Sequence, residues 1–371
     1  MRTAIVSDLH LGLLSGGDLA RDPGVRALLL EEIAGADRVV LLGDVVELRE
    51  LAIGAALAAA RPFFEELGAA LGGRQVVLVP GNHDHHLAQP LLDDLSLDGT
   101  PLGLAHQAGP SPGPTVSLDR WLGPAQLRVS YPGIWVRDDV YATHGHYMDA
   151  HLNLPRAECL AVATLARLSR PVPDPASAED YERVMRPIYG FAYGVAQARR
   201  DGRPRRRAPS ETAWRALASR GGAGLTRRRR LGFRAARAGF PVAVGIVNHL
   251  LRSDFDSDIS VRSIFEGGVA GAGEVARRLG VDGGHVITGH SHRAGPNPDE
   301  PEWELPGGGR LHNTGSWVFS SVFHRPGRPP NSYWPGTVTW VEDDAPPRRV
   351  QLLGDHQHPD IAAIAAANAT R

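Results

Sequence analysis

Five short groups of polar residues in this sequence carry the side-chain types of a metal site. Each group combines carboxylate, imidazole or amide side chains that lie close together in the chain. Carboxylate and imidazole together suit manganese, iron or zinc better than calcium or magnesium. In chain order the groups are SDLHLG from Ser7, GDVVE from Gly43, GNHD from Gly81, THGH from Thr143 and GHSH from Gly289.

The first and last groups each place two potential ligands one residue apart. Asp8 and His10 follow an apolar run, and side chains at positions i and i+2 of an extended segment point the same way. His290 and His292 have the same spacing, which puts their Cα atoms about 6–7 Å apart. That separation could serve two metal ions about 3.5–4 Å apart. Taken singly, each pair could equally be an ordinary turn.

Each polar group closes a short apolar run that is typical of a buried strand. Ligands of open α/β sheets collect outside the carboxyl ends of the strands, so we expect the five groups to converge on a binuclear metal site. Asp44 alone could instead cap a helix, with Glu47 as its partner. His85 and His86 are not expected to be ligands, because a helix there would turn them away from Asn82. The expected strands are Thr3–Ser7, Arg38–Leu42, Gln75–Val79, Val140–Thr143 and His285–Thr288.

Helical patterns separate these strands in the first part of the chain. Strand–helix–strand repetition favours a parallel sheet that is covered by helices. The second expected helix contains Pro62, at which we expect it to break. Helices are expected over Val25–Ala34, Leu48–Leu71, Ser263–Gly280 and Asp360–Asn368, and further strands over Leu127–Ser130, Ile134–Val136, Leu311–Asn313, Thr337–Glu342 and Arg349–Leu353.

Composition excludes several classes of protein. The 371 residues are 42% hydrophobic with a formal net charge of −1, which excludes a disordered chain and a general polyanion binder. The sequence contains no lysine, which excludes a lysine Schiff base, a P-loop lysine and a kinase lysine. The single cysteine, Cys159, excludes an internal disulfide and fits a reducing compartment. No apolar run reaches the about 18–20 residues that span a bilayer and no signal peptide is evident, so we expect a soluble, cytoplasmic protein.

The middle of the chain differs from both ends in charge. Residues 151–250 contain 19 arginines and seven Asp or Glu residues. This composition fits a solvated, helical, Arg-rich insertion. It also fits a cap whose basic face meets an anionic substrate or a membrane surface, and both interpretations stay open. We therefore expect a core of residues 1–150 and 253–355, a helical basic insertion of residues 151–252 and a C-terminal tail of residues 356–371.

The order of the five groups resembles that of the calcineurin-like metallophosphoesterases. The pattern of that family is D-x-H, G-D-x-x-D/E, G-N-H-D/E, x-H-G-H and G-H-x-H, and the five groups match it in order. The segment from Asn313 to Ser316 also resembles the N-x-G-S segment that often follows the last motif. The resemblance covers residues 1–150 and about 280–355 and does not cover the insertion. It implies an α/β fold, a four-layer αββα sandwich.

The resemblance also implies a role for each matching residue. His83 would be the general acid or the group that stabilises the transition state, with Glu47 or Asp84 orienting it, so these three are the catalytic candidates. Asn82 could in addition contact substrate, as could the Arg-rich insertion. The cofactors would be two divalent metal ions, with manganese as first choice and iron or zinc as alternatives. One ion would be held by Asp8, His10 and His292, the other by Asn82, His144 and His290, and Asp44 would bridge the two.

The activity that the resemblance implies is that of a metal-dependent phosphoric ester hydrolase. A metal-bound hydroxide would attack the phosphorus of a phosphomonoester, a phosphodiester or a diphosphate. Glu47 makes GDVVE similar to the G-D-x-x-E of the UDP-2,3-diacylglucosamine diphosphatase branch, whereas His83 stands where that branch typically has Arg. We expect a phosphorylated small-molecule or lipid substrate, either lipid-linked or a nucleotide sugar. A lipid substrate would bring the protein to the inner face of the membrane as a peripheral protein.

Two alternatives to this activity remain. A metal-dependent nuclease would use the basic insertion to follow the phosphates of DNA, although Trp214, Phe233 and Phe240 are widely spread among the arginines. A non-enzymatic, protein-binding scaffold would have lost ligand residues, whereas no ligand position is missing here. The oligomeric state does not follow from the sequence. Nor does the role of the insertion as a lid, a membrane contact or a partner surface.

Overall fold

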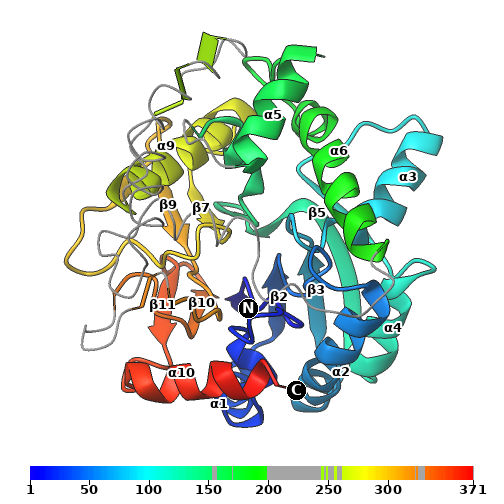
Figure 1. Cartoon of the computed structure of the whole chain (residues 1–371), viewed down its shortest axis with the longest axis vertical. Coiled ribbons are helices and arrows are strands. Elements are labelled where there is room, and N and C mark those ends of the chain that lie inside the picture. Colours follow the sequence, from blue (N-terminus) through cyan, green and yellow to red (C-terminus); the bar gives the residue numbers. More distant parts are fainter. Residues whose placement is uncertain are drawn as a thin grey trace, which may run out of the picture.

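Two β-sheets that share one long strand form the centre of the molecule (Figure 1). The computed structural model describes residues 1–152, 157–168, 170–198, 244–245, 248–249, 255–256, 261–321, 323–324 and 331–370. The described strands lie in the order β11-β10-β1-β2-β3-β5-β6-β7-β9-β8, and β4 pairs with β5. Their bounds are β1 Arg2–Val6, β2 Arg38–Leu42, β3 Gln75–Val79, β4 Ala105–Ala108, β5 Gln126–Arg137, β6 Val140–Thr143, β7 His285–Thr288, β8 Trp303–Glu304, β9 Arg310–Asn313, β10 Thr337–Glu342 and β11 Arg348–Gln351.

The long strand β5 belongs to both sheets. Residues 126–129 pair in parallel with β3, while residues 133–137 pair antiparallel with β6. We expected two separate strands here, and that expectation was wrong. Pro132 has no N–H to donate to a ladder, and it is tolerated because β5 changes partner at this point.

Side-chain alternation along the strands sorts the apolar residues into three cores. In β1, Ala4 and Val6 face one side and Ile5 faces the other, as the two-residue period of a strand requires. Ile5 packs between the sheets in one core with residues of both, such as Val77 and Ile287. The other two cores lie beneath helices on the outer faces of the sheets. This arrangement confirms the expected four-layer α/β sandwich.

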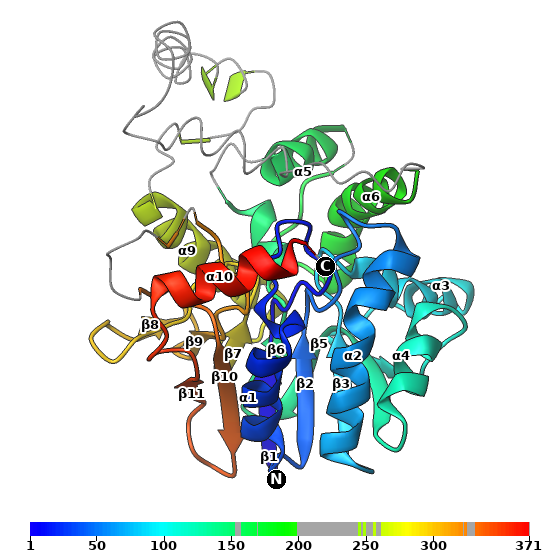
Figure 2. The same cartoon turned by 60° about the horizontal axis from the view of Figure 1, so that its bottom comes forward.

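Helices cover both outer faces of the pair of sheets (Figures 1 and 2). The first face is covered by α1 Pro23–Ile33, α2 Ile53–Leu71, α4 Pro114–Leu122 and α10 His358–Asn368. The core of the second face includes side chains of α3 Gln89–Leu97, α5 Ala157–Leu168, α6 Ala178–Gln197 and α9 Val261–Leu279. Short 3-10 helices lie at η1 Leu19–Arg21, η2 His85–Ala88 and η3 His146–Ala150.

Local sequence determines where helices α1 and α6 begin. The side chain of Asp22 accepts a hydrogen bond from the N–H of Gly24 at 2.9 Å, which caps the first turn of α1. At α6, Ser177 and Asp180 form a capping box, with reciprocal side-chain and backbone hydrogen bonds of 3.2 and 3.0 Å. Both caps satisfy N–H groups that a helix leaves without an internal partner.

Helix α2 continues through Pro62 without the expected break. An internal proline removes one helical hydrogen bond and costs roughly 3 kcal/mol. The residues that follow, Phe63, Phe64 and Leu67, are buried in the core beneath the helix. Each such side chain stabilises the fold by about 1.5–3 kcal/mol when it is fully buried. Burial of this face therefore outweighs the cost of the proline.

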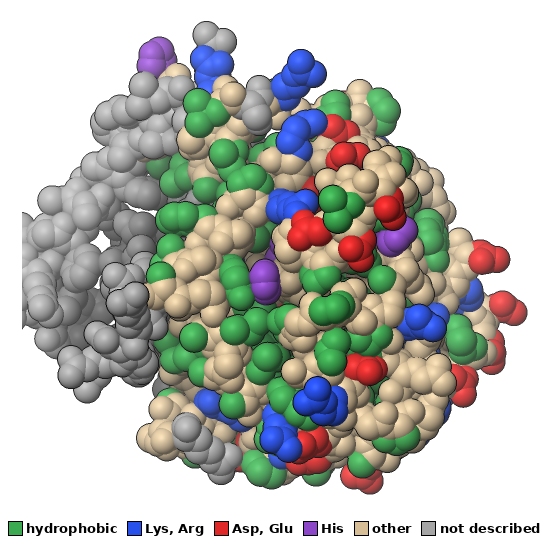
Figure 3. All heavy atoms as spheres, turned by 90° about the vertical axis from the view of Figure 1, so that its right-hand side faces the viewer, with side chains coloured by type: hydrophobic (Ala, Val, Ile, Leu, Met, Phe, Trp, Pro, Cys, Tyr) green, Lys and Arg blue, Asp and Glu red, His purple; other side chains and the backbone are tan. Residues whose placement is uncertain are grey.

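Polar contacts along α6 help to tie this helix of the insertion to the core. The N–H of Ile53, at the start of α2, donates to Gln197 Oε1 at 2.9 Å. Helix α2 begins at Ile53, whereas we expected it to begin at Leu48. On the face that carries α3 and α6, acidic side chains and arginines lie interspersed among apolar ones (Figure 3). There Arg186 Nη2 lies 2.7 Å from Asp93 Oδ1 of α3.

The end of the chain packs on the core. Residues 356–371, which we set apart as a tail, contain α10, and its Ile361 and Ala365 belong to the core under the first helical face. Asn368 Nδ2 donates to the carbonyl oxygen of Asp18 at 3.1 Å. Helix α10 is therefore part of the outer layer.

The Arg-rich part of the insertion, residues 199–243, lies outside the described residues. The expectations of a lid, a membrane contact or a phosphate-tracking surface rest mainly on that segment. Within the described part of the chain, each helix is either too short or too polar to cross a bilayer.

Candidate metal centre

The five polar groups meet where β1, β2, β3, β6 and β7 end. They come together although as many as 282 positions separate hydrogen-bonded residues such as Asp8 and His290. Among the described residues, atoms that could bind a metal form three overlapping groups, with all atoms of a group within 4.8 Å of one another. The groups are Asp8, His10 and His292; His10, Asp44 and His83; and Asp44, His144 and His290.

The first group is built around the carboxylate of Asp8. Its Oδ1 lies 3.3 Å from His292 Nε2 and 3.9 Å from His10 Nε2. Its Oδ2 accepts a hydrogen bond from Ser7 Oγ at 2.6 Å. A Cβ atom at Gly289 would lie only 2.5 Å from Asp8 Oδ2, so this position needs glycine. The last histidine motif can approach β1 closely for that reason.

Asp44 lies between imidazoles from two different motifs. Its Oδ2 is 3.6 Å from His10 Nε2 and 3.2 Å from His144 Nε2. Its Oδ1 accepts a hydrogen bond from the N–H of His83 at 2.7 Å. A Cβ atom at Gly81 would approach Asp44 Oδ1 to 2.4 Å, so the GNHD loop also needs a glycine to pass this carboxylate.

The amide of Asn82 lies against two further imidazoles. One of its polar atoms is 3.2 Å from His144 Nε2 and 3.1 Å from His290 Nδ1. With its nitrogen inward the amide donates to both rings, and with its oxygen inward it joins them as a set of acceptors that suits a cation. In the nitrogen-inward orientation, the oxygen of the amide accepts a hydrogen bond from Arg49 Nη1 at 3.0 Å.

Three of the histidines have one ring nitrogen occupied by a partner behind the site. A partner that accepts from one nitrogen fixes the tautomer and leaves the other nitrogen with a free lone pair, as metal-binding histidines require. The partners are Glu47 Oε2 for His10 Nδ1 at 2.9 Å, the carbonyl oxygen of Leu42 for His144 Nδ1 at 3.0 Å and Asp149 Oδ1 for His290 Nε2 at 3.0 Å.

Five of the predicted ligand residues have a left-handed backbone conformation. Their φ values are 55° at Asp8, 47° at His10, 51° at Asp44, 64° at His290 and 59° at His292. Our reasoning that the paired residues converge because the chain is extended was therefore wrong. The side chains converge because the backbone turns sharply at the strand ends. Each such residue costs on the order of 1–3 kcal/mol, so the surrounding contacts must hold the site in place.

Neighbouring imidazoles favour the ionised forms of two buried carboxylates at the centre, Asp8 and Asp44. Burial alone would raise the pKa of Asp8, but the imidazoles of His292 and His144 hold it well below its ordinary value. Burial acts in the same way on Asp44, and His144 and His83 again keep its pKa low. In turn, these carboxylates raise the pKa of His144 to about 9, although burial would lower it. A divalent cation that binds His144 must therefore displace the proton of this ring, so metal binding is expected to release protons.

Two buried atoms of the site fit a bound metal ion. Among the described residues, Asp8 Oδ1 and His10 Nε2 have no hydrogen-bond partner. Buried polar atoms without partners are rare in proteins and require an explanation. A divalent cation at this point would supply the missing partner. Carboxylate, imidazole and amide ligands together suit manganese, iron or zinc.

Comparison with known proteins agrees with this geometry. The sequence profile named calcineurin-like phosphoesterase matches residues 1–196, more than half of the chain. The chain belongs to the calcineurin-like phosphoesterase family. The protein is therefore a metal-dependent phosphoester hydrolase, as the order of the motifs implied.

Other comparisons add little to the family assignment. None of the curated proteins matches the sequence significantly. Among solved structures that match, one is a cold-active protein-tyrosine phosphatase of a psychrophile, Shewanella sp.. It is 12% identical, and the alignment covers 95% of this chain and 78% of that chain with a TM-score of 0.28.

In this phosphoesterase, Glu47 connects two of the predicted site histidines. Its Oε2 lies 2.7 Å from His83 Nδ1 and 2.9 Å from His10 Nδ1. Burial would raise the pKa of Glu47, but His83 and His10 hold it below its ordinary value. Of the two acidic residues predicted to orient His83, Glu47 is the one whose side chain contacts the ring.

Asp84 has a different position. Its carboxylate accepts hydrogen bonds from the N–H groups of Gly81 at 2.6 Å, Val45 at 2.7 Å and Asp44 at 3.2 Å. These contacts join the GDVVE loop to the GNHD loop. The structure therefore places Asp84 where it can fix the backbone around Asp44, and not beside the ring of His83.

Two residues at the centre, Asp149 and Arg49, were not among the candidates from the sequence. Asp149 is buried and contacts His290. Its closeness to the THGH motif was the one available signal. Arg49 lies two residues after Glu47, and its guanidinium reaches the amide of Asn82.

His85 and His86 turn away from the predicted ligands, as expected. His85 Nε2 lies 3.0 Å from Glu182 Oε2 of α6. The ring of His86 stacks on Tyr193, with ring centroids 3.9 Å apart. Both therefore connect the GNHD segment to the insertion.

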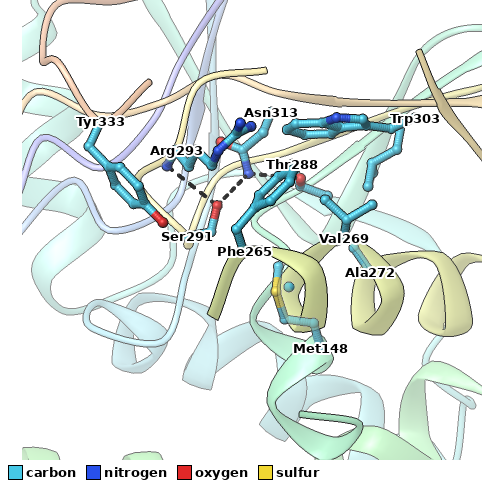
Figure 4. A pocket seen from close by; sticks show the side chains of 12 residues that line it. Met148, Phe265, Val269, Ala272, Thr288, Ser291, Arg293, Trp303, Asn313 and Tyr333 are labelled. Carbon is cyan, nitrogen blue, oxygen red and sulfur yellow. Dashed lines mark hydrogen bonds between the residues drawn. The ribbon is translucent and has the colours of Figure 1, made fainter. Parts of the chain in front are cut away.

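A largely apolar pocket adjoins the last histidine motif (Figure 4). Ser291 and Asn313 form a polar part of its wall, with 3.1 Å between Ser291 Oγ and Asn313 Nδ2. Arg293 lies over the ring of Phe265, 3.6 Å from its centroid, and pairs with Glu300. The N-x-G-S segment thus helps to hold the loop that carries the last two predicted ligands.

Proposed function

We propose that this phosphoesterase binds two divalent cations and uses them to hydrolyse a phosphomonoester, phosphodiester or diphosphate. Asp44 would be shared between a set of Asp8, His10 and His292 and a set of Asn82, His144 and His290. The observation that carries the proposal is the position of Asp44 Oδ2, 3.6 Å from His10 Nε2 and 3.2 Å from His144 Nε2. When bound, two such cations polarise phosphoryl oxygens and lower the pKa of a shared water.

His83 is proposed to hold the proton for the leaving oxygen. Its Nδ1 is engaged by Glu47 at 2.7 Å, so Nε2 is the ring atom that remains for the substrate. The side chain is 26% exposed, whereas Glu47 is fully buried, so substrate can reach the imidazole but not its partner. A histidine in this position can donate its proton as the bond to the leaving group breaks.

Asn82 and Arg49 are proposed to contact the phosphoryl group. The two side chains lie at the same edge of the site, with Arg49 Nη1 3.0 Å from the Asn82 amide. A guanidinium group can form two parallel hydrogen bonds to phosphate oxygens. Glu47 in GDVVE and the helical insertion favour a lipid-linked or nucleotide-sugar substrate. We also propose a cytoplasmic location, peripheral at the membrane for a lipid substrate, because the single cysteine, Cys159, fits a reducing compartment.

A panel of phosphate esters tests the proposed activity. Purified protein with added Mn²⁺ is assayed on bis(p-nitrophenyl) phosphate, p-nitrophenyl phosphate, UDP-sugars, lipid-linked diphosphates and single-stranded DNA. We expect hydrolysis of at least one ester or diphosphate, and its loss after chelation and in His290→Ala. His86→Ala is the matched control, because His86 stacks on Tyr193 outside the predicted ligand set. Full activity in His290→Ala or in chelated protein would contradict the proposal.

Elemental analysis tests the cofactor separately. Protein expressed without added metal should retain two equivalents of divalent metal per chain, with manganese preferred over iron and zinc. A chain that binds no metal would exclude the two-cation centre. Preferential cleavage of single-stranded DNA in the panel would instead support a nuclease.

A further inference from the structure

Helix α6 of the insertion carries a buried carboxylate that contacts the loops behind the metal centre. Glu182 is 5% exposed and does not belong to the predicted ligands. Its Oε1 accepts hydrogen bonds from Tyr131 Oη at 2.5 Å and Tyr147 Oη at 2.8 Å. Its Oε2 lies 3.0 Å from His85 Nε2. One side chain of the insertion therefore gathers three partners from β5, η3 and η2 of the core.

Two of these partners follow predicted ligands closely in the chain. His85 comes shortly after Asn82 in the segment GNHDH, and Tyr147 comes shortly after His144 in THGHY. Asn82 and His144 belong to the same proposed cation, because an atom of the Asn82 amide lies 3.2 Å from His144 Nε2. Glu182 thus joins the two loops whose spacing fixes that cation's ligands.

The third partner reaches the same side of the centre through His146. Tyr131 Oη lies 3.2 Å from His146 Nε2, in addition to its hydrogen bond to Glu182. The ring of His146 packs against that of His144, with centroids 5.6 Å apart. The aromatic ring of Tyr189, also on α6, contacts His146 with centroids 5.4 Å apart. Helix α6 therefore reaches His144 through the ring of His146.

Glu182 is ionised and its tyrosine partners are protonated. Burial would raise the pKa of Glu182, but His85 and the hydrogen bonds from its partners lower it below its ordinary value. Burial and Glu182 raise the pKa values of Tyr131 and Tyr147 well above the ordinary range. A buried carboxylate that accepts several hydrogen bonds is stable, whereas its loss leaves buried donors unsatisfied.

The other predicted set has its partners within the core. Ser7 Oγ donates to Asp8 Oδ2 at 2.6 Å, and Glu47 Oε2 lies 2.9 Å from His10 Nδ1. Both partners belong to the strand ends that carry the motifs themselves. A change at Glu182 should therefore act on one cation and spare the other.

We propose that Glu182 is a positioning residue that makes the insertion part of the metal centre. Through His85, Tyr131 and Tyr147 it holds the Asn82 and His144 loops at the spacing that one of the two cations requires. The inference rests on the proposed two-cation centre. Groups that hydrogen-bond directly to a metal ligand typically change metal affinity by about 10–100-fold when they are removed. Glu182 contacts the loops that carry the ligands, so we expect an effect at the lower end of that range.

Titration of the metal-free protein with Mn²⁺ tests this role. In Glu182→Gln, we expect the dissociation constant of one of the two sites to rise by about tenfold or more, while the other stays close to that of the wild type. Hydrolysis at saturating Mn²⁺ should return toward the wild-type rate. Glu179→Gln is the matched control, because Glu179 is exposed on the same helix. Circular dichroism and the melting temperature verify that both variants fold.

Tyr147→Phe tests the positioning role of Glu182 if Glu182→Gln fails to fold. This variant removes one hydroxyl that donates to Glu182 and should raise the same dissociation constant by a smaller factor. Unchanged affinity at both sites, or an equal loss at both, would overturn the role of Glu182. A wild-type protein that binds fewer than two ions would instead overturn the two-cation centre on which the inference rests.

Discussion

Two buried carboxylates outside the predicted ligand set, one in the core and one in the insertion, are satisfied in different ways. Asp18 Oδ2 accepts a hydrogen bond from the N–H of Gly12 at 2.9 Å and lies 3.2 Å from Arg21 Nε. Its Oδ1 has no hydrogen-bond partner in the part of the chain that the structure describes. Glu182 accepts hydrogen bonds from two tyrosines and contacts His85.

The difference shows that partners, and not burial alone, determine the charge of a buried acid. Burial raises the pKa of Asp18 from 3.8 to about 6, since Arg21 and Gly12 only partly oppose it. Burial is opposed more strongly at Glu182, where His85 and the tyrosines bring the pKa below its ordinary 4.5. Asp18 therefore contributes stability that is complete below pH 3.8 and lost as the pH rises through about 6. Glu182 contributes stability that is present above pH 4.5 and lost as the pH falls through its lowered pKa.

The largest effect is expected at Asp44, because its carboxylate contacts ligands of both proposed cations. In Asp44→Asn, the shared carboxylate becomes a neutral amide, and we expect kcat/KM to fall on the order of 1,000-fold. Hydrolysis of bis(p-nitrophenyl) phosphate with saturating Mn²⁺ measures the loss. Activity within an order of magnitude of the wild type would mean that the two cations do not share Asp44.

The contrast between the two buried acids can be measured through pH. Asp18→Asn keeps the shape of the side chain but cannot ionise. As the pH falls from 7 to 4, the free energy of unfolding of this variant relative to that of the wild type should therefore fall by roughly 2 kcal/mol. Denaturant unfolding of the metal-free proteins measures this difference. Glu182→Gln should show no such change between pH 7 and pH 5. A parallel pH dependence of Asp18→Asn and the wild type would show that Asp18 is ionised like Glu182.

Glu47 connects a predicted ligand with the predicted acid, so its loss should affect both binding and chemistry. In Glu47→Gln, we expect Mn²⁺ affinity to weaken by about 10–100-fold, because His10 loses its charged partner. The rate should stay low even at saturating Mn²⁺, because His83 loses the same partner. A kcat that recovers completely with added metal would show that Glu47 acts on His10 alone.

For Asp149, in contrast to Glu47, we expect a loss of metal binding without a loss of chemistry. It contacts His290 but not His83, so Asp149→Asn should weaken Mn²⁺ binding by about tenfold while added metal restores kcat. The same titration and rate assay serve both variants. Loss of kcat that persists at saturating metal would assign Asp149 a direct role in the reaction.

The sequence was sufficient for the parts of the centre that depend on local patterns. β-Branched runs located strands β2, β3, β6 and β7 at the residues where they occur, because buried parallel strands are continuously apolar. Polar groups at the ends of those runs indicated which side chains meet. The identity and order of the motifs were enough to recognise the family.

Features that depend on distant contacts were not predictable in this way. Glu182 and His85 lie 97 positions apart, and neither has a neighbour in sequence that reveals the pairing. In the local sequence, Pro62 indicated a break in α2. The core that stabilises the helix there includes residues of other elements, so its effect could not be predicted locally. Likewise, the left-handed conformation of Asp8 leaves no mark in the local sequence, because only glycine adopts it without cost.

The left-handed conformations at the strand ends have a consequence for laboratory evolution of this enzyme. A change such as Asp8→Gly or His292→Gly would relieve the strain of the local backbone while it deletes a predicted metal ligand. Selection for heat resistance alone would therefore favour the loss of these predicted ligands, a conflict between stability and turnover. A screen for hardier versions needs to score turnover in every round.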